Sequence, residues 1–136
     1  MKKILVIDDD QQFNKMICII LEDAGYEVRS APNGLEGLEM FMKERPDLVI
    51  TDLYMPEKEG LETIMELRQA DKQIRILVVS GGSPHMNMSE MFTMAGIFGA
   101  DAALPKPFDI GTFLQKVKEL FGDCSQLQGC IHEENR

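Results

Sequence analysis

Three carboxylates, one hydroxyl and one amine are the side chains of this chain best placed to carry out chemistry together. They belong to Asp8, Asp9, Asp52, Ser80 and Lys106, and each lies at or soon after the end of a short apolar run. An apolar run bounded by polar residues is typical of a strand buried on both faces. Adjacent carboxylates repel one another and resist burial, so Asp8 and Asp9 need a partner that offsets their charge.

A metal ion and a phosphoryl group together account for these residue types. A hard divalent cation, for which magnesium (Mg2+) is the best fit, relieves the repulsion among Asp8, Asp9 and Asp52. The chemistry indicated is phosphoryl transfer to a carboxylate, with Asp52 as the nucleophile that becomes an aspartyl phosphate. Magnesium would bridge Asp52 and the phosphoryl oxygens, Lys106 would pair with another of these oxygens, and Ser80 would hydrogen-bond a third.

Each of these residues also has an ordinary structural explanation. Asp9 or Asp10 can cap the helix that follows, and Ser80 before two glycines can simply shape a turn. Lys106 can be a solvated surface lysine. What favours chemistry is the combination, because ligand sites in parallel sheets lie at the carboxyl ends of the strands, where these side chains would meet.

The elements that would position these residues alternate between strand and helix along the whole chain. Apolar runs predict strands at residues 4–7, 26–31, 47–52, 74–80 and 100–104, and helical spacing predicts helices at residues 13–24, 33–45, 60–69, 88–98 and 109–121. Strands that are apolar throughout favour a parallel sheet covered by helices on both faces. Right-handed crossovers then limit the topology to a doubly wound α/β sheet.

Helical spacing also predicts which side chains turn toward the core. In the second helix, capped by Asn33, these are Leu35, Leu38, Phe41 and Met42. In the third helix they are Leu61, Ile64, Met65 and Leu67. Cys18 in the first helix is expected to be a small core residue.

Composition excludes several classes of protein. The 136 residues suffice for one domain, and 44% hydrophobic residues suffice for a proper core. A net charge of −9 argues against direct binding to nucleic acid or to an anionic membrane. Three cysteines are too few and too irregular for a disulfide framework, and no apolar segment is long enough to span a membrane. We expect a soluble cytoplasmic protein whose residues 122–136 form a mobile tail.

The segments ILVIDDD, DLVITDLYMP, ILVVSGG and GADAALPKPF, in this order, resemble the receiver domains of two-component response regulators. The resemblance covers nearly the whole chain and places the receiver domain at residues 1–121. It implies a flavodoxin-like fold with five parallel strands in the order 2-1-3-4-5 and five helices. It also implies a signalling module that catalyses its own phosphorylation and dephosphorylation. Asp52 would accept the phosphoryl group from a sensor histidine kinase or a histidine phosphotransfer protein.

The resemblance further implies a role for individual residues. Asp9 would bind magnesium directly, Asp8 through water, and the backbone carbonyl of Tyr54 would supply another ligand. Ser80 and Lys106 match the switch hydroxyl and the lysine of the family, and the Lys106–Pro107 bond is expected to be cis. Two positions depart from the family pattern. Ala103 replaces the usual switch aromatic, and Pro105 is tolerable only on an edge strand.

Other functions compete with this interpretation. The segment ILVIDDD also fits the Asp-x-Asp motif of haloacid-dehalogenase-type phosphatases through Asp8 and Asp10, but that assignment leaves Asp52 without a role. An inert docking module is a further alternative, against which the complete acidic site argues. As a receiver, the chain would act through a separate output protein or through an effector domain that this sequence does not contain.

Overall fold

A computed structural model describes residues 2–53, 60–81 and 87–122 of the chain. The strands are β1 (Lys3–Ile7), β2 (Glu27–Ala31), β3 (Leu48–Thr51), β4 (Arg75–Ser80) and β5 (Ala102–Pro105). The helices are α1 (Gln11–Asp23), α2 (Gly34–Lys43), α3 (Gly60–Ala70), α4 (Met88–Phe98) and α5 (Ile110–Leu120). Tyr54 and the predicted tail beyond Gly122 lie outside the described residues.

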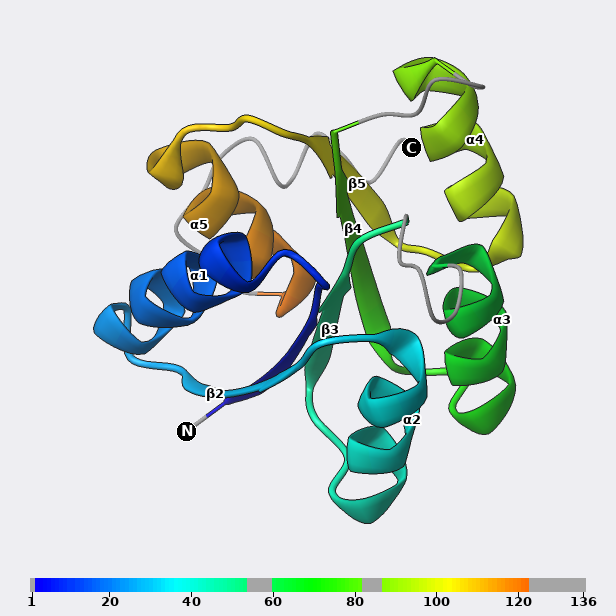
Figure 1. The fold of residues 1–136 in the computed structure, drawn as a ribbon, viewed down its shortest axis with the longest axis horizontal. Coiled ribbons are helices and arrows are strands. Elements are labelled where there is room, and N and C mark those ends of the chain that lie inside the picture. Colours follow the sequence, from blue (N-terminus) through cyan, green and yellow to red (C-terminus); the bar gives the residue numbers. More distant parts are fainter. Residues whose placement is uncertain (1, 54–59, 82–86, 123–136) are drawn as a thin grey trace.

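The strands form one parallel sheet in the order β2-β1-β3-β4-β5, which confirms the predicted fold class. Figure 1 shows α1 and α5 on one face of this sheet and α2, α3 and α4 on the other. The fifth strand begins at Ala102 rather than at residue 100 and ends with Pro105. β5 is an edge strand, where a proline is tolerated although it lacks a backbone N–H. This position of Pro105 agrees with the prediction.

The alternating side chains of the strands build one core on each face of the sheet. On the α1 and α5 face, fully buried residues of β1, β3 and β4 pack against Ile17, Leu21, Phe113 and Val117. Cys18 is partly buried beside this core, as expected. On the α2, α3 and α4 face, the other set of strand residues packs against Phe41, Ile64, Leu67 and Ala95.

Three residues predicted to face the core are instead exposed. The exposed fractions of Leu35, Met42 and Met65 are 53%, 59% and 40%. In α2 the buried residues are Gly34, Gly37 and Phe41. A Cβ atom at Gly37 would come within 2.5 Å of the Ile7 side chain, so the helix approaches the sheet along its glycines. Gly34, Gly37 and Phe41 thus form the inward face of α2, and Leu35 and Met42 lie outside that face.

In the part of the chain that the structure describes, no helix is both long enough and apolar enough to cross a membrane.

Candidate functional site

The carboxyl ends of β1 and β3 lie side by side because the register of the two strands pairs Ile7 with Thr51. The backbone N–H of Asp52 donates to the carbonyl of Ile7 at 3.1 Å, and the N–H of Asp8 donates to the carbonyl of Ala31 at 3.1 Å. The first residue after each strand is therefore still held by the sheet. This arrangement fixes Asp8 beside Asp52.

Asp8, Asp9 and Asp52 form one acidic cluster, as predicted. One carboxylate oxygen from each residue lies within 4.8 Å of the other two. Asp8 is 1% exposed and Asp52 is 8% exposed, whereas Asp9 is on the surface. Successive side chains on a strand point to opposite faces, so Asp8 and Asp9 can share one site only because β1 has ended at Ile7.

Lys106 brings a positive charge into this cluster. Its Nζ atom lies 3.1 Å from Asp8 Oδ2 and 3.1 Å from Asp52 Oδ2, and its side chain is 18% exposed. The backbone N–H of Lys106 donates to the carbonyl of Ser80 at 2.9 Å, which anchors the chain after β5 to the end of β4. The Lys106–Pro107 peptide bond is cis, as the resemblance implied.

Buried Asp8 and partly buried Lys106 have shifted pKa values. Burial raises the pKa of Asp8 and the Asp52 charge raises it further, against the lowering effect of a hydrogen bond from Asp10 and of Lys106. For Lys106, burial lowers the pKa, but the nearby carboxylates of Asp52 and Asp8 outweigh burial, so the pKa is raised. Lys106 therefore stays charged, while Asp8 carries a charge that its surroundings only partly compensate.

The backbone around Asp8 is fixed by two polar residues at the start of α1. Asp10 donates its N–H to Asp8 Oδ1 at 2.9 Å and caps α1 by accepting the N–H of Phe13 at 3.1 Å. Of the two predicted helix caps, Asp10 is the one that the structure confirms. Buried Asn14 donates its side-chain N–H groups to the carbonyls of Asp8 at 3.1 Å and Ala31 at 3.2 Å. Sequence reasoning did not identify Asn14, although a polar residue in an amphipathic helix next to the acids was a usable signal.

Ser80 ends β4, the strand next to β3, and is 1% exposed. Ile76 and Val78 belong to the core on the α2, α3 and α4 face. Side chains alternate along a strand, so Ser80 belongs to the same face. The hydroxyl is thus at the predicted edge of the sheet, on the side of α4.

The chemistry of the cluster suits magnesium. Hard divalent cations are bound by carboxylate and carbonyl oxygens, and the three grouped carboxylates offer oxygen ligands within reach of one ion. The proposed fourth protein ligand, the carbonyl of Tyr54, lies outside the described residues. The three acids therefore fit a magnesium site by their donor atoms and their spacing.

A further close contact involves Gly60, the first residue of α3. Its N–H donates to the carbonyl of Leu53 at 2.9 Å. A Cβ atom at this position would overlap the carbonyl oxygen of Asp52 and the Cα of Leu53. The absence of a side chain at Gly60 lets α3 begin directly against the backbone of Asp52, which sequence reasoning did not predict.

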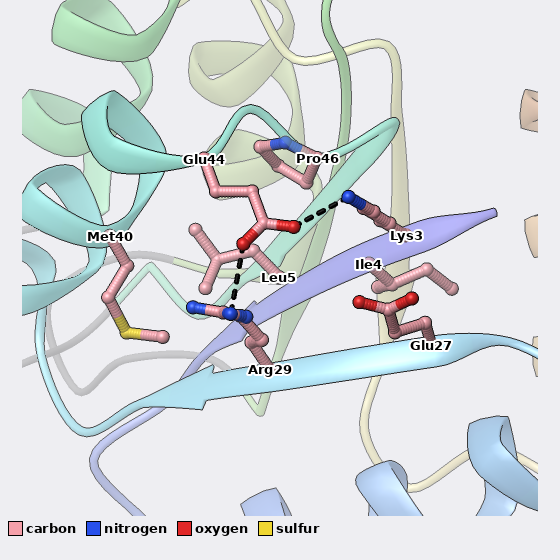
Figure 2. Close-up of a pocket in the computed structure, with 8 residues that line it drawn as sticks. All are labelled: Lys3, Ile4, Leu5, Glu27, Arg29, Met40, Glu44 and Pro46. Carbon is pink, nitrogen blue, oxygen red and sulfur yellow. Dashed lines mark hydrogen bonds and ion pairs between the residues drawn. The ribbon is translucent and has the colours of Figure 1, made fainter. Parts of the chain in front are cut away.

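A pocket that is separate from the acidic cluster lies at the other end of the strands, near the amino ends of β1 and β2 (Figure 2). Three of its charged groups pair with one another, since Glu44 contacts Lys3 Nζ at 2.6 Å and Arg29 at 2.9 Å. These ion pairs join the end of α2 to the two strands. We therefore interpret this pocket as a structural junction that is separate from the acidic cluster.

Comparison with protein families agrees with this geometry. A family model described as the response regulator receiver domain matches residues 4–118. Response regulator MprA of Mycobacterium leprae is 36% identical over 119 residues, which cover 87% of this chain and 50% of that protein. The DNA-binding dual master transcriptional regulator RpaA of Synechocystis is 31% identical over 137 residues, covering 98% and 55% respectively. The chain thus spans about half the length of the curated relatives that it matches.

Solved structures show the same fold. Chemotaxis protein CheY4 of Vibrio cholerae has a TM-score of 0.78 and 32% identity, covering 88% of this chain and 98% of that one. Response regulator TrrA of Thermotoga maritima, solved in complex with Mg(2+)-BeF, has a TM-score of 0.77 and 34% identity, covering 88% and 99%.

Proposed function

This chain belongs to the response regulator receiver domain family, and we propose that it accepts a phosphoryl group on Asp52 from a sensor histidine kinase or a histidine phosphotransfer protein. Membership of the family implies a phosphoacceptor role in two-component signalling. The observation that carries the assignment is the place of Asp52 directly after buried β3, in one cluster with Asp8, Asp9 and Lys106 and within the residues that the receiver family model matches.

The transfer needs little acid–base chemistry from the protein. A carboxylate oxygen of Asp52 forms the new bond to phosphorus while the bond from phosphorus to the donor nitrogen breaks. The Lys106 ammonium, already paired with Asp52, offsets the negative charge on the phosphoryl oxygens. Ser80 would donate a hydrogen bond to one of these oxygens.

Asp8 and Asp9 would hold magnesium together with Asp52 and the carbonyl of Tyr54. Magnesium, when bound, neutralises charge on the phosphoryl oxygens. The similarity to TrrA, solved with Mg(2+)-BeF, and the grouped carboxylates support this part of the proposal. In the same site the chain would promote its own phosphorylation and dephosphorylation.

The output step would be protein contact. The chain spans about half of its curated relatives, and RpaA is described as DNA-binding. We therefore propose that the signal passes either to a separate output protein or to an effector domain that this sequence does not include. The phosphatase alternative is not supported, because the family match over residues 4–118 is to receivers.

The test is phosphorylation with a small phosphodonor and magnesium, followed by mass mapping of the modified residue. We expect one phosphoryl group on Asp52. Asp52→Asn should remove the label and leave the unfolding transition cooperative, because asparagine keeps the shape of the side chain. A label on Asp8 in the wild type would contradict the proposal and favour the phosphatase alternative.

A further inference from the structure

Lys106 carries its charge between two carboxylates and an aromatic ring. Its Nζ atom lies over the ring of Phe13, 3.9 Å from the ring centroid, while Asp8 Oδ2 and Asp52 Oδ2 are both at 3.1 Å. A cation within about 6 Å of a ring centroid, over the ring face, is attracted by the quadrupole of the ring. Phe13 therefore contributes directly to holding the ammonium.

The ring of Phe13 is itself held in place. Its backbone N–H donates to the capping carboxylate of Asp10 at 3.1 Å. Its ring meets Phe108 edge to face, with 5.9 Å between centroids and an angle of 76°. Phe108 in turn stacks on Phe113, which is fully buried in the core, at 5.1 Å and 14°. A fixed ring next to a flexible lysine is suited to positioning the lysine.

The ring and the carboxylates hold the ammonium in different ways. A carboxylate accepts N–H donors in defined directions, whereas the attraction to a ring depends mainly on where the charge lies over the ring face. After Asp52 is phosphorylated, the Lys106 ammonium can therefore direct its N–H groups to a phosphoryl oxygen instead of the Asp52 carboxylate and still keep its contact with the Phe13 ring. The apolar ring also keeps water from this side of the charge.

We propose that Phe13 is a positioning residue for phosphoryl transfer, which keeps Lys106 Nζ at the acidic cluster through a cation–π contact before and during the reaction. The inference rests on the proposed function of Asp52. It extends the site to Phe13, whose side chain has neither a charge nor a hydrogen-bonding group.

The experiment replaces Phe13, by site-specific incorporation, with phenylalanines that carry one, two and three ring fluorines. Fluorine weakens the quadrupole stepwise and hardly changes the shape of the ring. We expect the rate of labelling by a small phosphodonor and magnesium to fall stepwise, by roughly three- to thirtyfold in total, as cation–π contacts of this kind predict. The same series at Phe41, whose ring lies 4.7 Å from the Arg45 guanidinium on the other face of the sheet, is the matched control and should leave the rate unchanged.

A second readout does not depend on activity. In the unphosphorylated protein, the Lys106 Cε–H signals should lose their upfield ring-current shift in Phe13→Leu. Unchanged signals, or a flat fluorine series in a protein whose wild type is labelled on Asp52, would overturn the role of Phe13 alone. A wild type that is not labelled on Asp52 would overturn the proposed function and this role with it. If Phe13→Leu does not fold, the labelling rates of the fluorine series alone test the role of Phe13.

Discussion

Asp8 carries a buried charge that its surroundings compensate only in part. It is 1% exposed, and burial together with the Asp52 carboxylate raises its pKa in spite of Lys106 and the Asp10 N–H. In the folded chain Asp8 therefore binds its proton more tightly than in the unfolded chain. As the pH rises from the ordinary value of 3.8 through the raised pKa, the unfolded chain ionises first and the stability of the folded state falls. At neutral pH an ionised Asp8 lowers the free energy of unfolding.

Asp8→Asn removes this charge and keeps the shape of the side chain, so we expect it to raise the melting temperature at pH 7 in metal-free buffer. The gain should disappear as the pH falls below the ordinary range of an aspartate, where Asp8 is protonated in both states. Thermal unfolding of both proteins between pH 3 and pH 8 measures the difference. A variant that is less stable than the wild type at pH 7 and equal at low pH would show that the pair with Lys106 outweighs the burial of Asp8.

Asp9 differs from Asp8 because it is exposed, so its charge costs little without a metal. Asp9→Ala should leave the metal-free melting temperature nearly unchanged and should reduce the stabilisation that magnesium produces, since a ligand stabilises the state that binds it. Titration of magnesium into the wild type and the variant measures both effects. Equal magnesium affinities would mean that the three acids are not a metal site.

The strands and the edge where the site forms follow from local sequence. Apolar runs that end in Asp8, Asp52 and Ser80 are visible in the chain, and parallel pairing alone brings their ends to one edge. Phe13 and Asn14 were not predicted as site residues because their roles depend on contacts with Lys106 and with the carbonyl of Ala31, both distant in sequence. Helical spacing identifies an apolar face but does not show that a phenylalanine meets a charge there.

The contact between the start of α3 and the end of β3 depends on Gly60. The role of this glycine was not predicted either, because the carbonyl of Asp52 limits the space for a side chain there, and helical spacing does not reveal that contact. Gly60→Ala should shift this backbone or α3, with a loss of roughly 1–3 kcal/mol in the free energy of unfolding, as is usual for overpacking, and with slower labelling of Asp52. Gly96→Ala in α4 is the matched control, since a Cβ there meets nothing within 4 Å. It should stabilise the protein by up to about 1 kcal/mol. Chemical denaturation and labelling rates test both, and equal effects would show that space at Gly60 is not limiting.

On the scale of the whole molecule, the sheet separates two cores, and Ser80, the proposed switch hydroxyl, and Ala103 belong to only one of them. Ser80 lies on the face that is covered by α2, α3 and α4, and Ala103 packs against the core of that face. Ala103 is paired with Val78 across β4 and β5. The resemblance to receivers implies an aromatic side chain at this position, whose rotation would report phosphorylation. Alanine has no such rotation, so position 103 of β5 cannot report phosphorylation by a rotamer change.

We therefore expect the effect of phosphorylation to reach Gly81 and α4 rather than β5. Gly81 is exposed with open space around it. Among the α4 side chains that the structure describes, buried Ala95 and the partly buried Phe92 and Phe98 contact the core of this face. A hydroxyl that moves toward a phosphoryl group would therefore displace the start of α4 more easily than β5. We expect a phosphoryl mimic to change amide chemical shifts strongly at residues 80–81 and 87–94 and weakly at residues 102–104, and Ser80→Ala to reduce the first set while the mimic still binds. Changes concentrated at residues 102–104, with residues 87–94 silent, would place the switch in β5 and contradict this route.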